Sequence, residues 1–212
     1  MKTVLCYGDS LTWGYDAETG GGRHPLPDRW PSVLKAALGD VDVIADGLNG
    51  RTTAFDDPLA SADRNGARIL PTILSTHTPI DLSILLLGTN DMKPAIHGNP
   101  QLAKRGMARL IEIIRSHDYP GGGHASDILL VAPPPIVATE NAEFTELFAG
   151  GEASSQRLAG LYEAVADETG CGFFDAGTVA QATPRDGVHL DVANTRKIGE
   201  ALAPVVRLML QL

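Results

Sequence analysis

Hydrophobic and polar positions along the chain follow two alternating patterns. Short runs of β-branched and aliphatic residues are separated by longer segments in which apolar positions recur at helical spacing. Five runs are predicted to be strands: Thr3–Tyr7, Val41–Ala45, Leu82–Leu87, Ile128–Ala132 and Gly172–Asp175. The third is apolar almost throughout, which is typical of a central strand buried on both faces. The alternation predicts an α/β fold, in which helices cover both faces of a five-stranded parallel sheet in three α/β/α layers.

The same pattern predicts four main helices. They are Pro31–Leu38, Pro100 to about His117, Ala153–Thr169 and a last helix from about Val192. Pro31 and Pro100 stand where a first helical residue is expected, because a first-turn N–H needs no partner inside the helix. Gly170 follows the third helix as a typical C-terminal cap. Pro204 is expected to kink or interrupt the last helix.

Two longer stretches fit neither pattern and are predicted to be irregular, namely Gly14–Arg29 and Pro133–Gly151. Each follows a strand, so both should lie at the carboxyl edge of the sheet, where open α/β folds bind ligands. They are expected to shape the entrance of a site there. Phe144, Leu147 and Phe148 in the second stretch are expected to be buried by a neighbouring subunit.

Composition narrows the function classes. The 212 residues are 43% hydrophobic and 20% charged, which fits one self-folding domain over residues 1–212. A net charge of −9 argues against a nucleic-acid partner, since phosphate binding needs clustered Lys and Arg. The most apolar run, Ile80–Gly88, falls well short of the ~20 residues of a membrane span. No signal-peptide pattern precedes Thr3, so a cytoplasmic location is expected. Cys6 and Cys171 lie in apolar runs and are expected to pack in the core.

A candidate nucleophile follows the first strand in the sequence Gly8-Asp9-Ser10-Leu11. A serine at this strand exit lies beside a helix amino terminus, so it can offer both its hydroxyl and its backbone N–H to a substrate. An aspartate and a serine at a strand end are also a common helix cap. The motif therefore needs a second element before it indicates catalysis.

That element is Asp186-Gly187-Val188-His189, just before the last helix. Across a turn of this length the carboxylate can accept a hydrogen bond from one ring nitrogen and leave the other free to take a proton from serine. An isolated Asp-x-x-His is more often a turn cap followed by a surface histidine.

Two further loops should lie at the same sheet edge as Ser10. They are Gly47–Arg51 after the second strand and Gly88–Asp91 after the third. Gly50 permits a close approach of backbone to a substrate oxygen, and the amide of Asn90 can donate a hydrogen bond without carrying charge. Both are candidates to stabilise an oxyanion, together with the N–H of Ser10. Considered singly, each is more often a turn residue.

Taken together in their order along the chain, the four motifs resemble the GDSL or SGNH hydrolase superfamily over the whole chain. The resemblance implies a flavodoxin-like SGNH fold. It also implies a catalytic triad of Ser10, His189 and Asp186 and an oxyanion hole formed by Ser10, Gly50 and Asn90. The extended blocks Gly8–Gly14 and Asn49–Thr53 and the run Pro133–Pro135 look like the bacterial arylesterase, acyltransferase and carbohydrate acetylesterase branch. Several members of that branch form octamers, so the resemblance also implies a homo-oligomer.

The predicted activity is hydrolysis of small-molecule esters with short acyl groups through an acyl-serine, with acyl transfer to alcohols as a variant. Deacetylation of sugars is the main alternative, and a thioesterase or lipase-like role is more distant. A non-catalytic flavodoxin-like binding domain would require Ser10 and His189 to be unrelated. The chain lacks the Gly-x-Ser-x-Gly elbow, which disfavours the α/β-hydrolase fold.

Other polar and aromatic residues near the motifs have simpler interpretations. Asp9 and Asp91 are expected mainly to hold their loops by accepting backbone hydrogen bonds, although Asp9 is also a candidate pocket residue. Trp13 is predicted to form a wall of the acyl pocket. The histidines outside the motif are expected at the surface or as caps: His24, His77, His97, His117 and His124. None of them is spaced as a metal ligand, and the Gly-x-Gly-x-x-Gly pattern is absent, so no metal or cofactor is predicted.

Overall fold

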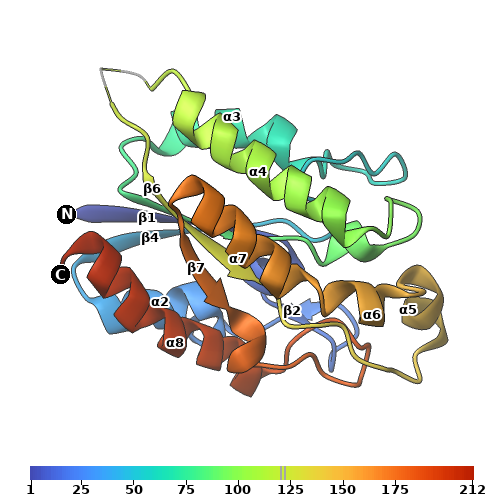
Figure 1. Ribbon diagram of the computed structural model, residues 1–212. Helices are drawn as coiled ribbons and strands as arrows, with labels where there is room; N and C mark the ends of the chain where they lie inside the picture. Colours follow the sequence, from blue (N-terminus) through green and yellow to red (C-terminus); the bar gives the residue numbers. More distant parts are fainter. Residues whose placement is uncertain (120, 122) are drawn as a thin grey trace.

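The computed structural model describes residues 1–119, 121 and 123–212. Its main sheet has five parallel strands in the spatial order β4-β1-β5-β6-β7 (Figure 1). The strands are β1 Lys2–Gly8, β4 Val41–Gly47, β5 Leu82–Leu86, β6 Asp127–Ala132 and β7 Gly172–Asp175. Numbered along the chain, this order is 2-1-3-4-5, the flavodoxin-like arrangement. The predicted fold class is confirmed, with strand ends shifted by at most two residues.

Helices cover both faces of the sheet (Figure 1). On one face lie α2 Trp30–Leu38 and α8 Val192–Leu210, and on the other lie α3 Gly66–His77, α4 Pro100–Ser116 and α7 Leu158–Thr169. Alternate β1 side chains serve two cores: Leu5 and Tyr7 pack with α3, α4 and α7, whereas Val4 and Cys6 pack with α2 and α8. All five residues of β5 are buried, as expected of the central strand.

Three helix predictions need correction. α3 was not predicted at all, because Pro71 lies inside it and interrupts the sequence pattern; Asn65 caps its start by accepting from the N–H of Arg68. The predicted helix Ala153–Thr169 is two helices, α6 Gly151–Ser155 and α7. α8 continues through Pro204 without a break. Packing against the core thus stabilises α3 and α8 enough to offset the cost of a proline inside each helix.

The two stretches predicted to be irregular also contain regular structure. In Gly14–Arg29, β2 Tyr15–Asp16 pairs antiparallel with β3 Gly22–Arg23, and a 3-10 helix covers Leu26–Asp28. Pro133–Gly151 contains α5 Ala142–Leu147, capped by Asn141. Both stretches follow strands and lie at the carboxyl edge of the sheet, as predicted (Figure 1). The elements are too short to give a clear periodic signal.

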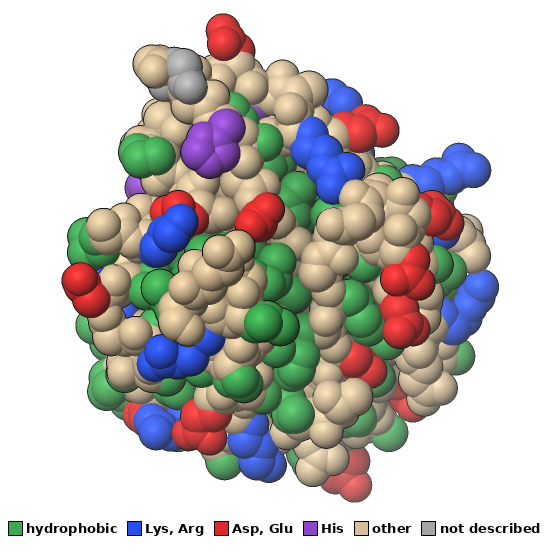
Figure 2. All heavy atoms as spheres, turned by 60° about the vertical axis from the view of Figure 1, so that its left-hand side comes forward, with side chains coloured by type: hydrophobic (Ala, Val, Ile, Leu, Met, Phe, Trp, Pro, Cys, Tyr) green, Lys and Arg blue, Asp and Glu red, His purple; other side chains and the backbone are tan. Residues whose placement is uncertain are grey.

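The surface seen from the side of the chain termini shows acidic and basic side chains interspersed (Figure 2). Charges of neither sign gather into one patch on this face. Cys6 is fully buried in the core, as predicted, and Cys171 is half-buried; both are free thiols. Within residues 1–119, 121 and 123–212, no helix is both long enough and apolar enough to cross a lipid bilayer.

Candidate active site

The first strand delivers Ser10 to the carboxyl edge of the sheet. α1 Ser10–Trp13 starts directly after β1, and Asp9 caps it by accepting the Leu11 N–H at 2.9 Å. β1 and β5 flank the point at which strand order reverses, and ligands of open α/β sheets bind outside such points. Ser10 is only 5% exposed, so its hydroxyl lies at the bottom of a depression.

Residues 179 positions apart meet at this hydroxyl. His189 Nε2 lies 3.0 Å from Ser10 Oγ, and His189 Nδ1 lies 2.6 Å from Asp186 Oδ2. Because the Asp186 carboxylate can only accept, Nδ1 carries the proton and Nε2 is free to accept from Ser10. The structure therefore brings together the three residues that the sequence assigned to a triad.

The turn around Asp186 orients it toward the imidazole. Its Oδ1 accepts the N–H groups of Val188 at 3.0 Å and His189 at 2.9 Å. Burial alone would raise the pKa of Asp186, but the hydrogen bonds and charge of His189 and these backbone donors bring the pKa below its usual value. Gly187 permits the turn: its φ is +78°, and a Cβ there would lie 2.4 Å from the Val137 carbonyl oxygen. Asp186 is thus held ionised and aimed at Nδ1.

Gly50 and Asn90 lie on the same pocket as Ser10. Among the described residues, the backbone N–H groups of Ser10 and Gly50 have no hydrogen-bond acceptor. Asn90 Nδ2 donates to Asp9 Oδ2 at 3.3 Å and to the Arg51 carbonyl at 3.2 Å, both long bonds. The three groups are the ones that the sequence proposed as oxyanion donors.

Gly50 has a conformational reason to be glycine. Its φ is +81°, and a Cβ would lie 2.7 Å from the guanidinium of Arg64. Arg64 is held by an ion pair with Asp57 at 2.8 Å. Any larger residue at position 50 would strain the loop and displace Arg64, which also lines the pocket.

Buried carboxylates support the loops beneath the pocket. Asp91 accepts the N–H and the hydroxyl of Thr53, at 3.0 and 2.5 Å, which ties the Gly50 loop to the Asn90 loop. Asp9 is fully buried; burial and the charge of Asp91 raise its pKa to about 7. Both residues hold loops, as predicted, and neither lines the pocket around Ser10.

The pocket over Ser10 has a volume of about 130 Å³. It lies well below the roughly 300–1,000 Å³ of sites for drug-sized ligands, so it suits a small group. Its walls correct one prediction. Trp13 is not among the lining residues. Its ring makes a cation–π contact with the guanidinium of Arg23, whose Cζ atom lies 4.7 Å from the ring centroid. Tyr15 takes that place, stacked on the His189 ring with centroids 3.9 Å apart.

The three residues expected at a subunit contact line the pocket. Phe148 is buried by its own chain, and Phe144 meets the His189 ring edge-on with centroids 5.8 Å apart. Leu147 remains 38% exposed. The helix α5 carries them over the site, and the sequence prediction missed this because it assigned no helix there.

Lys93 and Arg64 complete the pocket and were not singled out in the sequence. Lys93 follows Asn90 by three residues in the same loop, which was the available signal. Its Nζ lies 5.2 Å from the centre of the Phe148 ring. Burial, and then the charge of Arg64, lower the pKa of Lys93. Two cationic side chains therefore border the space above the nucleophile.

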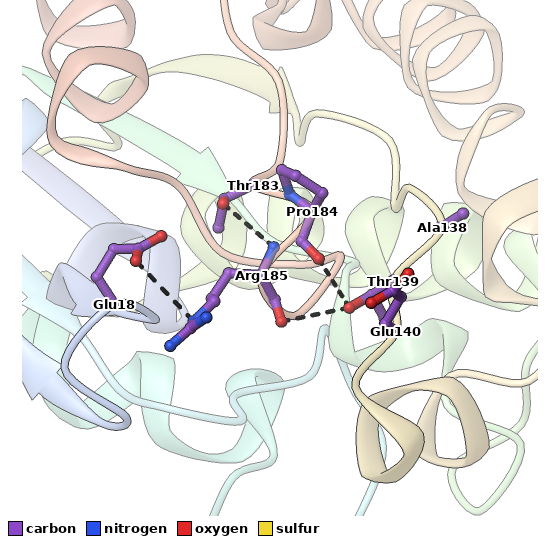
Figure 3. A pocket seen from close by; sticks show the side chains of 7 residues that line it. All are labelled: Glu18, Ala138, Thr139, Glu140, Thr183, Pro184 and Arg185. Carbon is purple, nitrogen blue, oxygen red and sulfur yellow. Dashed lines mark hydrogen bonds and ion pairs between the residues drawn. The ribbon is translucent and has the colours of Figure 1, made fainter.

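A wider polar depression continues from the pocket. A hollow of about 600 Å³ includes Tyr15, Phe144 and Asp186 on its inner side and Glu18, Glu140 and Arg185 farther out. The latter three also line an adjoining hollow of about 570 Å³ with Thr139 (Figure 3). Glu18 and Arg185 face each other across it at 3.9 Å. Both stretches predicted to shape the entrance contribute residues to this groove.

The remaining histidines show one departure from expectation. His24 is buried rather than at the surface, with Nε2 2.9 Å from the Leu190 carbonyl oxygen. His97 accepts the Asn99 N–H at 3.0 Å, which fits a capping role. In the part of the chain that the structure describes, His, Cys, Asp and Glu side chains form no cluster of three or more suited to a metal ion.

Several solved structures that resemble this chain along nearly its whole length are described as esterases. A solved structure of a carbohydrate acetylesterase family member from Sinorhizobium meliloti has 61% identity and a TM-score of 0.98, with all of both chains covered. A second carbohydrate acetylesterase from that organism has 38% identity and a TM-score of 0.94, and the aryl esterase of M. smegmatis has 40% identity and a TM-score of 0.94. Each covers 99% of this chain and 100% of its own.

No curated protein matches the chain in sequence. The GDSL-like lipase/acylhydrolase family matches residues 6–194, which include all the candidate site residues. The chain is a carboxylic ester hydrolase and belongs to the GDSL-like lipase/acylhydrolase family.

Proposed function

We propose that the protein hydrolyses esters of short acyl groups through a covalent acyl-serine formed on Ser10. The observation that carries this proposal is the 3.0 Å contact between Ser10 Oγ and His189 Nε2, backed by Asp186 at 2.6 Å. His189 takes the proton of Ser10 as Oγ attacks the ester carbonyl, and then gives it to the departing alcohol. Water repeats the sequence on the acyl-serine and releases the acid.

The developing oxyanion would be stabilised by the N–H groups of Ser10 and Gly50 and by Asn90 Nδ2. The support is that the two backbone donors have no acceptor among the described residues, and that the Asn90 bonds are long enough to yield to a charged oxygen. Asp186 stays ionised and stabilises the imidazolium that forms at His189. A neighbouring alcohol could replace water in the second step, which would give acyl transfer.

The decisive experiment is Ser10→Ala, with Ser154→Ala as the matched control. The hydroxyl of Ser154 makes only one long hydrogen bond, 3.4 Å to the Gly98 carbonyl oxygen, and has no catalytic role in this proposal. We expect S10A to fold normally, lose labelling by a fluorophosphonate probe, and lose p-nitrophenyl acetate hydrolysis by roughly 10⁴-fold or more. S154A should keep both. Labelling or turnover retained by S10A would refute the assignment.

Deacetylation of sugars is a second candidate, and the polar groove favours it. Carboxylates, a guanidinium and a hydroxyl border the side of the pocket that Tyr15 and Asp186 share, where the departing alcohol would lie. Such groups suit a polyol better than an aryl ring. Comparing kcat/KM for an acetylated sugar and for phenyl acetate tests this preference.

A homo-oligomer and a cytoplasmic location stay predictions from the sequence and its family resemblance. Exposed apolar side chains such as Leu59 and Leu208, 92% and 79% exposed, are available for an interface. Light scattering on purified protein tests the assembly, and cell fractionation tests the location.

A further inference from the structure

Lys93, which lines the pocket over Ser10, has no direct ion-pair partner among the described residues. Of the five lysines, Lys2, Lys35 and Lys104 pair with carboxylates, and Lys197 is exposed on α8. Lys93 is half-buried, and no carboxylate oxygen among the described residues lies within 4.0 Å of its Nζ. A sequestered ammonium without a counter-ion is costly, so its retention at a binding pocket points to a ligand that supplies the charge.

Lys93 lines the pocket, and the side chains around it do not form a direct ion pair with its ammonium. Phe148 lies beneath Nζ at 5.2 Å and offers only a ring face. The other cation in the pocket wall, Arg64, is already neutralised by Asp57 at 2.8 Å. The buried acids Asp9 and Asp91 are engaged by the hydrogen bonds of Leu11, Asn90 and Thr53. The charges of Asp57, Asp9 and Asp91 act on Lys93 only from beyond 4.0 Å, so the pocket keeps one cation without a direct ion pair.

The chemistry of the proposed reaction assigns the side of the ester that meets this group. The leaving oxygen must face His189 to receive its proton, so the alcohol extends toward Tyr15 and the polar groove. The carbonyl oxygen faces Gly50 and Asn90. The acyl chain takes the remaining direction, into the small part of the pocket bordered by Lys93, Leu147 and Phe148.

We propose that Lys93 is a specificity-determining residue that lets the pocket take short acyl groups ending in a carboxylate, such as half esters of succinate. This inference rests on the proposed esterase function. The acyl carboxylate pairs with the Lys93 ammonium, while its methylene groups lie against Phe148 and Leu147. The pocket volume of about 130 Å³ limits the acyl group to a few carbons.

The test compares two esters of the same shape, ethyl hydrogen succinate and ethyl 4-methylpentanoate, which differ in the terminal charge. Ethanol release gives kcat/KM for each. We expect the wild-type enzyme to favour the succinate ester, and Lys93→Met to lower the succinate-to-methylpentanoate ratio by roughly 10- to 100-fold, the value of a charge-assisted hydrogen bond. Lys93→Arg should retain the preference, and the exposed, unpaired control Lys197→Met should leave the ratio unchanged.

Two results would overturn the inference. One is a wild-type enzyme that favours the neutral ester, and the other is a K93M variant that slows both esters by the same factor. The second result would mean that the ammonium acts on the oxyanion and not on the acyl group. A wild-type enzyme that turns over neither ester nor ethyl acetate would instead contradict the proposed function. K93R, which keeps the charge, provides the comparison if K93M does not fold.

Discussion

The floor and the rim of the pocket are built in different ways. The floor consists of Ser10, Gly50 and Asn90, which follow β1, β4 and β5 within a few residues and rest on the buried carboxylates of Asp9 and Asp91. The rim comprises Tyr15, Lys93, Phe144, Leu147, Phe148 and Arg185, which come from the hairpin, α5 and connecting loops. The floor is fixed by sheet register, whereas the rim depends on how loops fold over it. Chemistry should therefore be sensitive to the floor, and substrate choice to the rim.

After Ser10→Ala, the largest effect is expected from Asp186→Asn, which removes the group that orients the general base. An amide can present its N–H to Nδ1, which favours the wrong imidazole tautomer, so kcat on p-nitrophenyl acetate should fall by about 10⁴-fold. Asp175→Asn is a control, since Asp175 ends β7 at the same sheet edge but only caps a 3-10 helix. A loss of less than tenfold in D186N would mean that Asp186 merely shapes the turn.

Asn90→Ala tests the floor itself. Loss of one oxyanion donor should lower kcat by roughly 10²–10³ with little change in KM, because the bond strengthens only as charge develops on the carbonyl oxygen. Steady-state kinetics with a short-chain ester measures this. If KM rises and kcat is unchanged, Asn90 binds the ground state and is not an oxyanion donor.

Asp9→Asn tests how the floor responds to pH. Since burial raises the folded-state pKa of Asp9 to about 7, the folded protein holds a proton that the unfolded chain releases near pH 4. The stabilisation is fully present below pH 4 and is lost as pH rises through 7, by on the order of 4 kcal/mol. Urea unfolding of wild type and D9N between pH 4 and 8 should diverge in this direction. Parallel stability curves would contradict it.

The smallest effect is expected at the outer rim. Arg185→Ala removes an exposed cation from the groove, held only by a long contact with Glu18. KM for an acetylated sugar should rise by about two- to tenfold, the range of an exposed polar contact, while kcat/KM for p-nitrophenyl acetate stays the same. An equal loss on both substrates would mean that Arg185 supports the catalytic residues Asp186 and His189. It would then argue against the division between floor and rim.

The difference between floor and rim also separates successful from failed sequence predictions. Ser10, Gly50 and Asn90 directly follow strands whose hydrophobic pattern is strong, so their common edge could be inferred. Tyr15 and Phe144 lie in segments with turn residues and no lasting period, and the sequence prediction assigned Trp13 to the wall and Phe148 to a subunit contact. α3 was missed because Pro71 interrupts its pattern, although core packing holds the helix together.

The sequence by itself determined the parallel α/β sheet and the order of the four motifs, since buried strands and capped helices are marked by local patterns. Only the tertiary structure decided which side chains face Ser10. Contacts such as Tyr15 on His189 and Phe148 beside Lys93 join segments far apart in the chain. Such contacts depend on loop geometry and on the packing of the assembled core. Neither of these produces a periodic pattern of hydrophobic and polar residues in the sequence.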